Sequence, residues 1–264
     1  MSVSSKDVLI YLSHRDVGDW NAMMADLRSQ KAIDLSDVER LCKSVDQKCI
    51  TYIDVDFPPA LRDIVYPPIV LYYEGDLTLL SSYPKYVSFA GSFNIDPETA
   101  STFRRITSKI ASSKEVGIIS GLAAGCQLNA VMAALDAGAK PIVFLPCGLD
   151  VYEKPEHVGI RQTLSQRGLV LTPFPKGTPV DPSRLRIRNR LIAQVSDFLL
   201  VGSSRKNEGV LEMVSYALNR GRDVGCLPFR VEDANYNNAL LRDGAVLVES
   251  GEDVLYELQT ASVF

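Results

Sequence analysis

The sequence predicts an α/β fold, with a doubly wound and mainly parallel sheet preceded by a small N-terminal helical domain. From Tyr86 onward, short apolar runs rich in β-branched residues alternate with stretches of helical periodicity. The short runs are apolar at nearly every position, which is typical of strands covered on both faces. Residues 1 to about 50 instead contain short helical patterns. The 264 residues leave room for one medium and one smaller domain.

We divide the chain into an N-terminal part, residues 1–80, and a sheet domain, residues 81–264. In the first part, residues 19–30 place apolar side chains at helical spacing. Residues 34–45 form a second expected helix, with Ser36 as its N-cap and Glu39 three residues later. Two Pro-Pro pairs interrupt residues 49–77, so we expect this segment to be an extended, turn-rich linker.

The sheet domain alternates between the two kinds of element along its whole length. We expect strands at residues 86–91, 116–120, 141–146, 169–175, 197–203, 223–228 and 245–250. The helices between them are expected at residues 97–113, 128–138, 159–168, 208–221 and 237–244, with a further helix opening near Arg188. Sheets of this class bind their ligands in the loops at the carboxyl ends of the strands.

Four of these loops are rich in glycine and small polar residues, which predicts a phosphate or nucleotide pocket. Glycine lets backbone N–H groups approach a phosphate closely, and the following helix N-terminus favours negative charge. The alternative is that tight turns require these glycines in any case. No loop matches G-x-G-x-x-G or the Walker pattern, so we expect no NAD or ATP cofactor. The candidate residues are Gly91, Ser92, Ser120, Gly121, Gly125 and Gly148.

An arginine cluster lies in the stretch RLRIRNRLIAQVS, which carries Arg184, Arg186, Arg188 and Arg190. The planar guanidinium fork matches phosphate oxygens. The chain has a formal net charge of −4, which argues against DNA binding over the whole surface and leaves room for a focused anion site. The alternative is a solvated helix start held by surface ion pairs.

The remaining composition limits other chemistry. Five cysteines lack C-x-x-C spacing and only two histidines occur, so we expect neither a zinc site nor a disulfide framework. No histidine lies near Cys126, Cys147 or Cys226 in sequence, which argues against a cysteine nucleophile. We see no signal peptide and no apolar stretch of membrane-spanning length, so we expect a cytoplasmic protein that does not engage a membrane.

Several motifs carry a resemblance to a known family. They are DFPPALRDIVYPPIVLYYEGDL, Gly91-Ser92, SGLAAGCQLNAVMAAL, CGLDVYEKPEH, RNRLIAQVS, GRDVGCLP, NNALLRDGA and GEDVL. In order and spacing they resemble the DNA-processing protein A (DprA or Smf) family, from about Cys49 onward. RNRLIAQVS is similar to Arg-Asn-Arg-Ile-Ile-Ala, the most specific motif of that family.

The resemblance implies an extended Rossmann-like domain after a small helical domain of the sterile-alpha-motif type. It also implies a homodimer that binds single-stranded DNA, protects incoming DNA and loads RecA in natural transformation. Members are not known as enzymes and need no cofactor. Many carry a C-terminal winged helix, for which we see no room before Phe264.

The chain departs from the family at several loop positions. Phe93 replaces an arginine, Ala124 a basic residue, Gln127 an aspartate and Val131 a histidine. Each replacement removes charge or hydrogen-bonding capacity from the expected pocket. Phe93 is suited either to stacking on a base or to packing in the core or a dimer.

Five polar residues remain as expected DNA contacts: Arg188, Asn189, Arg190, Lys140 and Lys176. For the arginines the alternative is a buried ion pair that fixes the loop. Asn189 fits equally well as a helix cap. The two lysines fit equally well as plain surface residues.

Two other functions stay open. One is a nucleotide-hydrolysing enzyme of the same superfamily, although that chemistry needs a pocket carboxylate and Gln127 and Gly202 stand at the expected positions. The other is a diverged scaffold that binds only a protein partner.

Overall fold

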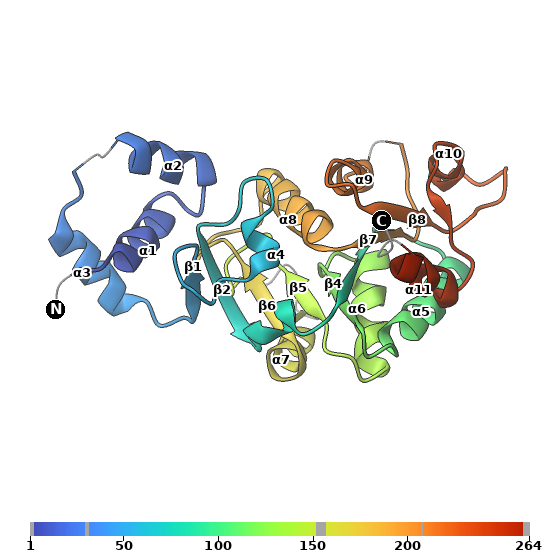
Figure 1. Cartoon of the computed structure of the whole chain (residues 1–264), viewed down its shortest axis with the longest axis horizontal. Helices are drawn as coiled ribbons and strands as arrows, with labels where there is room; N and C mark the ends of the chain where they lie inside the picture. The colour runs from blue at the N-terminus through green and yellow to red at the C-terminus, as the bar shows by residue number, and fades with distance from the viewer. Residues whose placement is uncertain (1–2, 30–31, 152–156, 207, 261–264) are drawn as a thin grey trace.

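A nine-stranded sheet with helices on both faces forms the body of the molecule in the part of the chain that the computed structural model describes, residues 3–29, 32–151, 157–206 and 208–260. The strand order is β1-β2-β6-β5-β4-β3-β7-β8-β9. Figure 1 shows the N-terminal helices at one end of this sheet and the C-terminal helices at the other.

Seven strands are parallel and confirm the predicted fold class. The parallel part of the sheet starts at β3 in the middle, continues outward through β4 and β5 to β6, and then returns to the other side of β3 as β7. This reversal makes the carboxyl ends of β3 and β7 the point where such sheets bind ligands. The strands are β3 (Lys85–Ala90), β4 (Val116–Ser120), β5 (Ile142–Phe144), β6 (Leu169–Thr172), β7 (Phe198–Val201), β8 (Asp223–Cys226) and β9 (Val246–Leu247).

Helices cover both faces because successive strand residues point to opposite sides. Val87 and Phe89 of β3 pack with α5, α6 and α11, whereas Ala90 packs with α8 and α9. The helices are α5 (Pro97–Ala111), α6 (Cys126–Asp136), α7 (His157–Arg167), α8 (Pro182–Val195), α9 (Val210–Leu218), α10 (Asn237–Arg242) and α11 (Gly251–Thr260).

Helix α8 begins six residues earlier than the sequence analysis predicts. Asp181 is its N-cap, and the Asp181 side chain accepts a hydrogen bond from the backbone N–H of Ser183. Pro182 at the first helical position has no N–H to satisfy and a φ angle suited to a helix. The arginine run therefore lies inside a helix, not at its start.

Three helices precede the sheet: α1 (Ser5–Arg15), α2 (Trp20–Ser29) and α3 (Leu35–Ser44). Ser4 and Asp7 form a capping box at α1, which the sequence analysis did not identify. The prediction of Ser36 as the N-cap of α3 is wrong. Asp34 is the cap, and its carboxylate accepts from both the N–H and the hydroxyl of Ser36.

The segment that we expected to be a linker supplies two strands of the sheet. β1 (Cys49–Thr51) pairs antiparallel with β2 (Val70–Gly75), and β2 pairs antiparallel with β6. A short helix, α4 (Pro59–Arg62), lies between these two strands in sequence, and a 3₁₀ helix at Leu77–Ser81 follows β2. The Pro-Pro pairs lie outside the strands, where a missing N–H does not break the ladder.

The N-terminal helices share a hydrophobic cluster with the sheet. Leu12 and Met23 pack with Val70 and Tyr72 of β2 and with Val143 of β5. All of these side chains are almost fully buried. The N-terminal part is therefore docked on the β2 end of the sheet by apolar burial.

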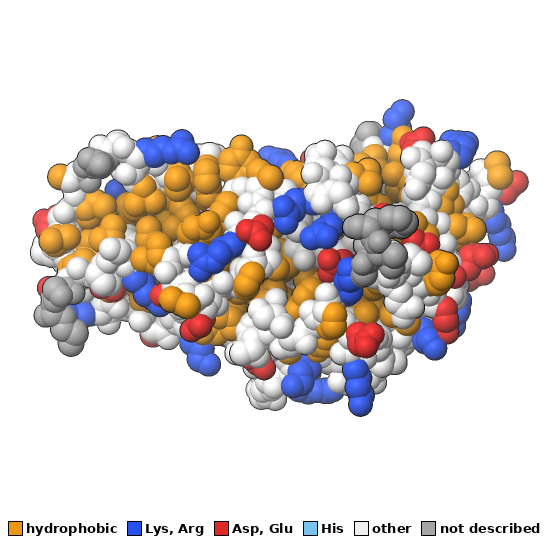
Figure 2. All heavy atoms as spheres, in the orientation of Figure 1, with side chains coloured by type: hydrophobic (Ala, Val, Ile, Leu, Met, Phe, Trp, Pro, Cys, Tyr) orange, Lys and Arg blue, Asp and Glu red, His pale blue; other side chains and the backbone are white. Residues whose placement is uncertain are grey.

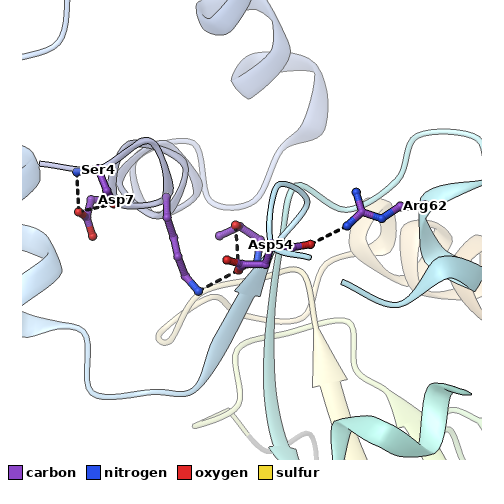
Figure 3. Close-up of polar contacts among 6 residues, drawn as sticks. Ser4, Asp7, Asp54 and Arg62 are labelled. Atoms are coloured by element: carbon purple, nitrogen blue, oxygen red, sulfur yellow. Dashed lines mark hydrogen bonds and ion pairs between the residues drawn. The ribbon is translucent and has the colours of Figure 1, made fainter. Parts of the chain in front are cut away.

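Polar contacts around Asp54 reinforce this junction (Figure 3). The ammonium of Lys6 on α1 lies 2.8 Å from Asp54 Oδ2, and the N–H of Thr51 donates to the same oxygen at 2.8 Å. Arg62 donates to the backbone carbonyl of Asp54 at 2.6 Å and to that of Tyr52 at 2.8 Å. One turn after β1 thus connects α1 to α4.

Two general features complete the fold. The five cysteines, all within the described ranges, form no disulfide with one another, and Cys126, Cys147 and Cys226 are buried. Across the described ranges, we find no helix with the length and apolar character needed to cross a bilayer.

Candidate functional site

A pocket of about 250 Å³ opens at the carboxyl ends of β3, β4 and β7, at the edge where the sequence predicts a site. Its wall combines the glycine loops with one side of α8 and the start of α9. Among the residues that line it are Gly91, Phe93, Gln127, Arg186, Arg188, Asn189, Glu208, Glu212 and Met213.

Backbone hydrogen bonds join the loops beneath this pocket. The N–H of Gly202 donates to Ala90 O at 3.0 Å, and that of Ser92 donates to Ser203 O at 2.9 Å. The N–H of Cys126 donates to Ser92 O at 3.3 Å. These three N–H groups are hydrogen-bonded within the protein and are not available to a ligand. The loops therefore form a rigid base of the pocket, and side chains provide the groups that contact a ligand.

Two glycines permit this close packing. Gly125 has φ +75°, and a Cβ there would lie 2.1 Å from Ser92 O. A Cβ on Gly121 would lie 2.2 Å from Nη1 of Arg188 and 2.7 Å from Oε1 of Gln127. Only a residue without a side chain leaves space for the guanidinium at Gly121.

Arg188 forms the cationic wall of the pocket. It is 3% exposed, and its Nη1 donates to Oε1 of Gln127 at 3.1 Å. Gln127 is itself fixed because its Nε2 donates to Phe89 O at 3.2 Å. The guanidinium is thus held in a defined orientation at the pocket wall, which reduces the entropy lost when it binds an anion.

Two carboxylates enter the same pocket, and the sequence analysis did not assign them a role. The hydroxyl of Ser92 donates to Oε2 of Glu208 at 2.5 Å, and the N–H of Arg205 donates to that oxygen at 3.1 Å. Glu212 lines the pocket one turn of α9 further on. Glu208 therefore engages a hydroxyl and an N–H of the kind that would bind a phosphate oxygen.

Arg190 lies in a different hollow from Arg188. Its Nη2 donates to Tyr66 O at 3.2 Å, and its guanidinium carbon lies 5.1 Å from the centre of the Tyr66 ring. Arg186, four residues before Arg190, is exposed and lines the first pocket. The predicted cluster is thus divided between two hollows on either side of α8.

Asn189 lines the first pocket together with Arg188. The alternative that it caps a helix is wrong, because α8 begins at Pro182 and Asn189 lies in its interior. Its Nδ2 is close to Gly209 at the start of α9, where an added Cβ would lie 3.3 Å away.

Four other predicted residues lie outside the first pocket. Lys140 precedes β5 and is therefore at the amino ends of the strands, on the opposite edge. Lys176 is exposed, and its Nζ lies 2.5 Å from Oδ1 of Asp46. Ser120 is buried and donates to Gln127 O at 3.2 Å, and the N–H of Gly148 donates to Thr178 O at 2.9 Å. Both act in the loop framework.

Phe93 and Cys126 have contrasting environments. Phe93 is 56% exposed at the pocket edge, so its ring is available for stacking and is not a core residue. Burial raises the pKa of the Cys126 thiol to about 12. A thiol with that pKa is protonated at neutral pH and is not a nucleophile.

A larger hollow of about 440 Å³ lies beside the start of α5 and the loop after β8. It is lined by two arginines, Arg205 and Arg230, and by three carboxylates, Asp96, Glu98 and Asp233. This excess of negative charge disfavours a phosphate. The smaller pocket beside Arg188 is therefore the better candidate for an anion.

Sequence comparisons match this chain to one family of known proteins. Residues 48–259 match the family described as DNA recombination-mediator protein A. DNA processing protein DprA of Streptococcus pneumoniae is 32% identical over 78% of this chain and 73% of its own length. Protein Smf of Synechocystis is 30% identical over 79% of this chain but only 53% of its own length.

Solved structures agree with the sequence matches. A crystal structure of DprA from Streptococcus pneumoniae has a TM-score of 0.81 and 25% identity, over 97% of this chain and 99% of that chain. A structure of DNA processing protein A from Helicobacter pylori, reported for its single-stranded DNA binding mode, has a TM-score of 0.72 and 25% identity. It covers 82% of this chain and 98% of that chain.

Proposed function

The chain belongs to the DNA recombination-mediator protein A family, and on that premise we propose that it binds single-stranded DNA and loads RecA onto it during natural transformation. In this proposal it is a cytoplasmic homodimer that protects incoming DNA and catalyses no reaction. The relatives named DNA processing protein support the DNA-related part of the proposal.

The main support for this proposal is the pocket beside Arg188. A buried guanidinium with a fixed orientation stands at the carboxyl ends of the central strands, next to loops closed by glycine. Guanidinium groups bind phosphate oxygens through charge-assisted hydrogen bonds. Without built-in recognition of base edges, such a pocket binds the backbone with little base specificity.

The proposal is tested by titrating a labelled single-stranded oligonucleotide, followed by fluorescence anisotropy. We expect binding at low salt that weakens as salt rises, and Arg188→Ala should weaken it on the order of tenfold. Arg105→Ala is the matched control, because Arg105 is exposed on α5, on the sheet face opposite α8. Absence of binding at low salt contradicts the proposal.

The partner and dimer parts of the proposal need separate measurements. Light scattering after gel filtration should give the mass of two chains. Strand exchange by RecA on DNA coated with single-strand-binding protein should be faster when this protein is added. A monomeric mass contradicts the dimer, and unchanged strand exchange contradicts RecA loading.

A second candidate function is hydrolysis of the glycosidic bond of nucleoside monophosphates, which releases the free base. The pocket carboxylates Glu208 and Glu212 favour it. That chemistry needs a carboxylate beside a bound phosphate. Incubation with nucleoside monophosphates followed by detection of free base tests it, with Glu212→Gln as the inactive control. Base release that is lost in Glu212→Gln would replace the proposal of a non-enzymatic protein.

A third candidate is a scaffold that keeps only protein contacts. Negligible DNA affinity, together with RecA binding or self-association that survives the combined change Arg188→Ala and Arg190→Ala, would favour it.

A further inference from the structure

A second hollow of about 250 Å³ lies between the N-terminal helices and α8. Trp20 and Met23 line it from α2, Tyr66 and Pro68 from the loop before β2, and Ile187 and Arg190 from α8. In Figure 2, hydrophobic side chains gather over the N-terminal helices on the face shown.

Two aromatic rings and one guanidinium form the wall of this hollow. Trp20 and Tyr66 meet edge to face, with ring centres 4.8 Å apart and planes at 77°. Arg190 lies over Tyr66 at 5.1 Å. Aromatic faces beside an arginine are the surfaces on which single-strand-binding proteins stack bases, because every base has a π face.

Tyr66 has a backbone conformation that few tyrosines adopt. Its φ is +56°, in the left-handed region, and 47% of the residue is exposed. A bulky residue at positive φ costs free energy and persists only where its surroundings hold it in that conformation. Arg190 supplies part of that support by donating to Tyr66 O at 3.2 Å. Its contacts with Arg190 and Trp20 place the exposed ring at the edge of the hollow.

The N-terminal domain is held firmly enough to complete the hollow. An added Cβ on Gly18 would lie 2.5 Å from Pro173 O, so the turn before α2 touches the loop after β6 directly. The hydroxyl of Tyr72 on β2 donates to Oγ of Ser13 at 3.1 Å. Trp20 is therefore positioned by contacts with the sheet domain.

The charge of Arg190 is only partly compensated. Within the described residues, its partners are one carbonyl and one aromatic ring, and no carboxylate lies within ion-pair distance. Burial lowers the pKa of the guanidinium, although it stays charged. Asp19 also lines the hollow, but no ion pair among the described residues joins it to Arg190, so the half-buried guanidinium keeps its capacity to bind an anion.

The two hollows are neighbours across α8. Arg186 lines the first and Arg190 the second, and residues four apart are neighbours on a helix surface, about 6 Å apart along its axis, so these two arginines lie where the hollows meet. Arg188 between them faces the first hollow. A strand that crosses α8 would thus meet positive charge on both sides.

We propose that the second hollow is a base-binding subsite, in which a nucleobase of single-stranded DNA packs against Trp20 and Tyr66 while an adjacent phosphate contacts Arg190. This rests on the proposed function, because the same strand places another phosphate beside Arg188. The N-terminal domain then contacts DNA directly and does not merely stabilise the fold.

Trp20 is the single tryptophan of the chain, so its emission reports on this hollow alone. Two oligonucleotides of about 12 nucleotides are titrated, one of thymidines and one abasic with the same sugar–phosphate chain. Anisotropy of a label measures binding, and Trp20 emission measures stacking. We expect both to bind, with the thymidine strand alone quenching Trp20.

Substitutions at Tyr66 separate stacking from charge. Tyr66→Asn removes the ring with a residue that tolerates positive φ, and Tyr66→Phe keeps the ring. We expect Tyr66→Asn to weaken binding of the thymidine strand about tenfold and to leave the abasic strand unchanged. Tyr66→Phe should bind the thymidine strand as tightly as the wild type does. Tyr256→Asn, which removes an exposed ring on α11, should have no effect.

Three outcomes would overturn the proposal. Bound thymidine DNA that leaves Trp20 emission unchanged places the bases elsewhere, as does equal quenching by the abasic strand. Equal weakening of both strands by Tyr66→Asn would assign the residue a structural role. If neither strand binds the wild-type protein, the proposed function itself fails and the subsite with it. The Trp20 measurement decides even if Tyr66→Asn does not fold.

Discussion

At the residue scale, Arg188 and Glu208 have opposite effects in one small pocket. Arg188 presents a fixed positive charge, whereas Glu208 places a negative charge on the hydroxyl of Ser92 and the N–H of Arg205. The carboxylate occupies donors that a phosphate would use and repels an approaching anion. Glu208 therefore sets a limit on how strongly the pocket binds DNA.

Removing that charge should strengthen binding. Glu208→Gln keeps the size of the side chain, and we expect a gain of about 1 kcal/mol, roughly fivefold in affinity for single-stranded DNA. Oligonucleotide anisotropy at low salt measures it. Glu74→Gln, the same change at an exposed position on β2, is the control for net charge. Unchanged or weaker binding in Glu208→Gln would show that the carboxylate does not compete with phosphate.

Gly121 determines whether the guanidinium of Arg188 has room in the pocket. A methyl group at this position would overlap Nη1 of Arg188, so Gly121→Ala should displace the guanidinium and weaken DNA binding as much as Arg188→Ala does. We also expect a loss of about 1–3 kcal/mol in the free energy of unfolding. Thermal unfolding and anisotropy on the same sample test this. Wild-type affinity in Gly121→Ala would separate Arg188 from the binding site.

At the scale of one element, α8 determines where the arginines act. Because it begins at Pro182, residues 186, 188 and 190 lie within little more than one turn of the helix, point in different directions and divide between two hollows. A helix starting at Arg188 would instead have left Arg184 and Arg186 in the preceding loop. The helix start therefore decides which arginines share a ligand.

The cap of α8 is open to a direct test. Asp181→Ala removes the hydrogen bonds to Ser183, and we expect a loss of about 1 kcal/mol in the free energy of unfolding. Chemical denaturation measures the change. Asp181→Asn keeps the capping oxygen and should lose less. Equal stability of Asp181→Ala and the wild type would mean that the cap contributes nothing.

The sequence predicted which strands and helices of the sheet domain form better than it predicted the residues at which they begin and end. Strand and helix alternation was sufficient for the parallel sheet because apolar periodicity directly reflects burial. The start of α8 was not predicted, although Asp181-Pro182-Ser183 carries the signals of a helix start, an N-cap residue followed by a proline in the first turn. Glu208 was missed because its contact with Ser92 joins residues 116 positions apart, which no local pattern encodes.

At the scale of the whole molecule, the N-terminal domain and the sheet form one continuous body. The segment before β2 contributes strands to the sheet, and the N-terminal helices share buried side chains with it. The division near residue 80 stays a prediction from sequence, and the strands before it belong to the central sheet. DNA bound at α8 would therefore meet both parts of the chain.

The junction at Asp54 should make stability depend on acidity. Burial acts to raise the pKa of this carboxyl, but hydrogen bonds from Lys6 and Thr51 outweigh it and lower the pKa overall. A lowered pKa in the folded state stabilises the fold above the unfolded pKa of about 4, and this contribution is lost as the pH falls through the folded value.

Asp54→Asn should therefore have a lower Tm than the wild type at pH 7, and the difference should shrink as the pH falls below about 4. Differential scanning calorimetry across this range measures it. Asp56→Asn is the control, since Asp56 is exposed two residues away. A difference in Tm that stays constant with pH would mean that the ion pair does not stabilise the junction.

If a DNA phosphate binds beside Arg188, the salt dependence of DNA binding should change when this arginine is removed. Affinity for a single-stranded oligonucleotide is measured over a series of salt concentrations for the wild type and Arg188→Ala. Each phosphate contact contributes about 0.7 to the slope of log affinity against log salt. We expect a slope about 0.7 shallower in Arg188→Ala. Equal slopes for the two proteins would contradict it.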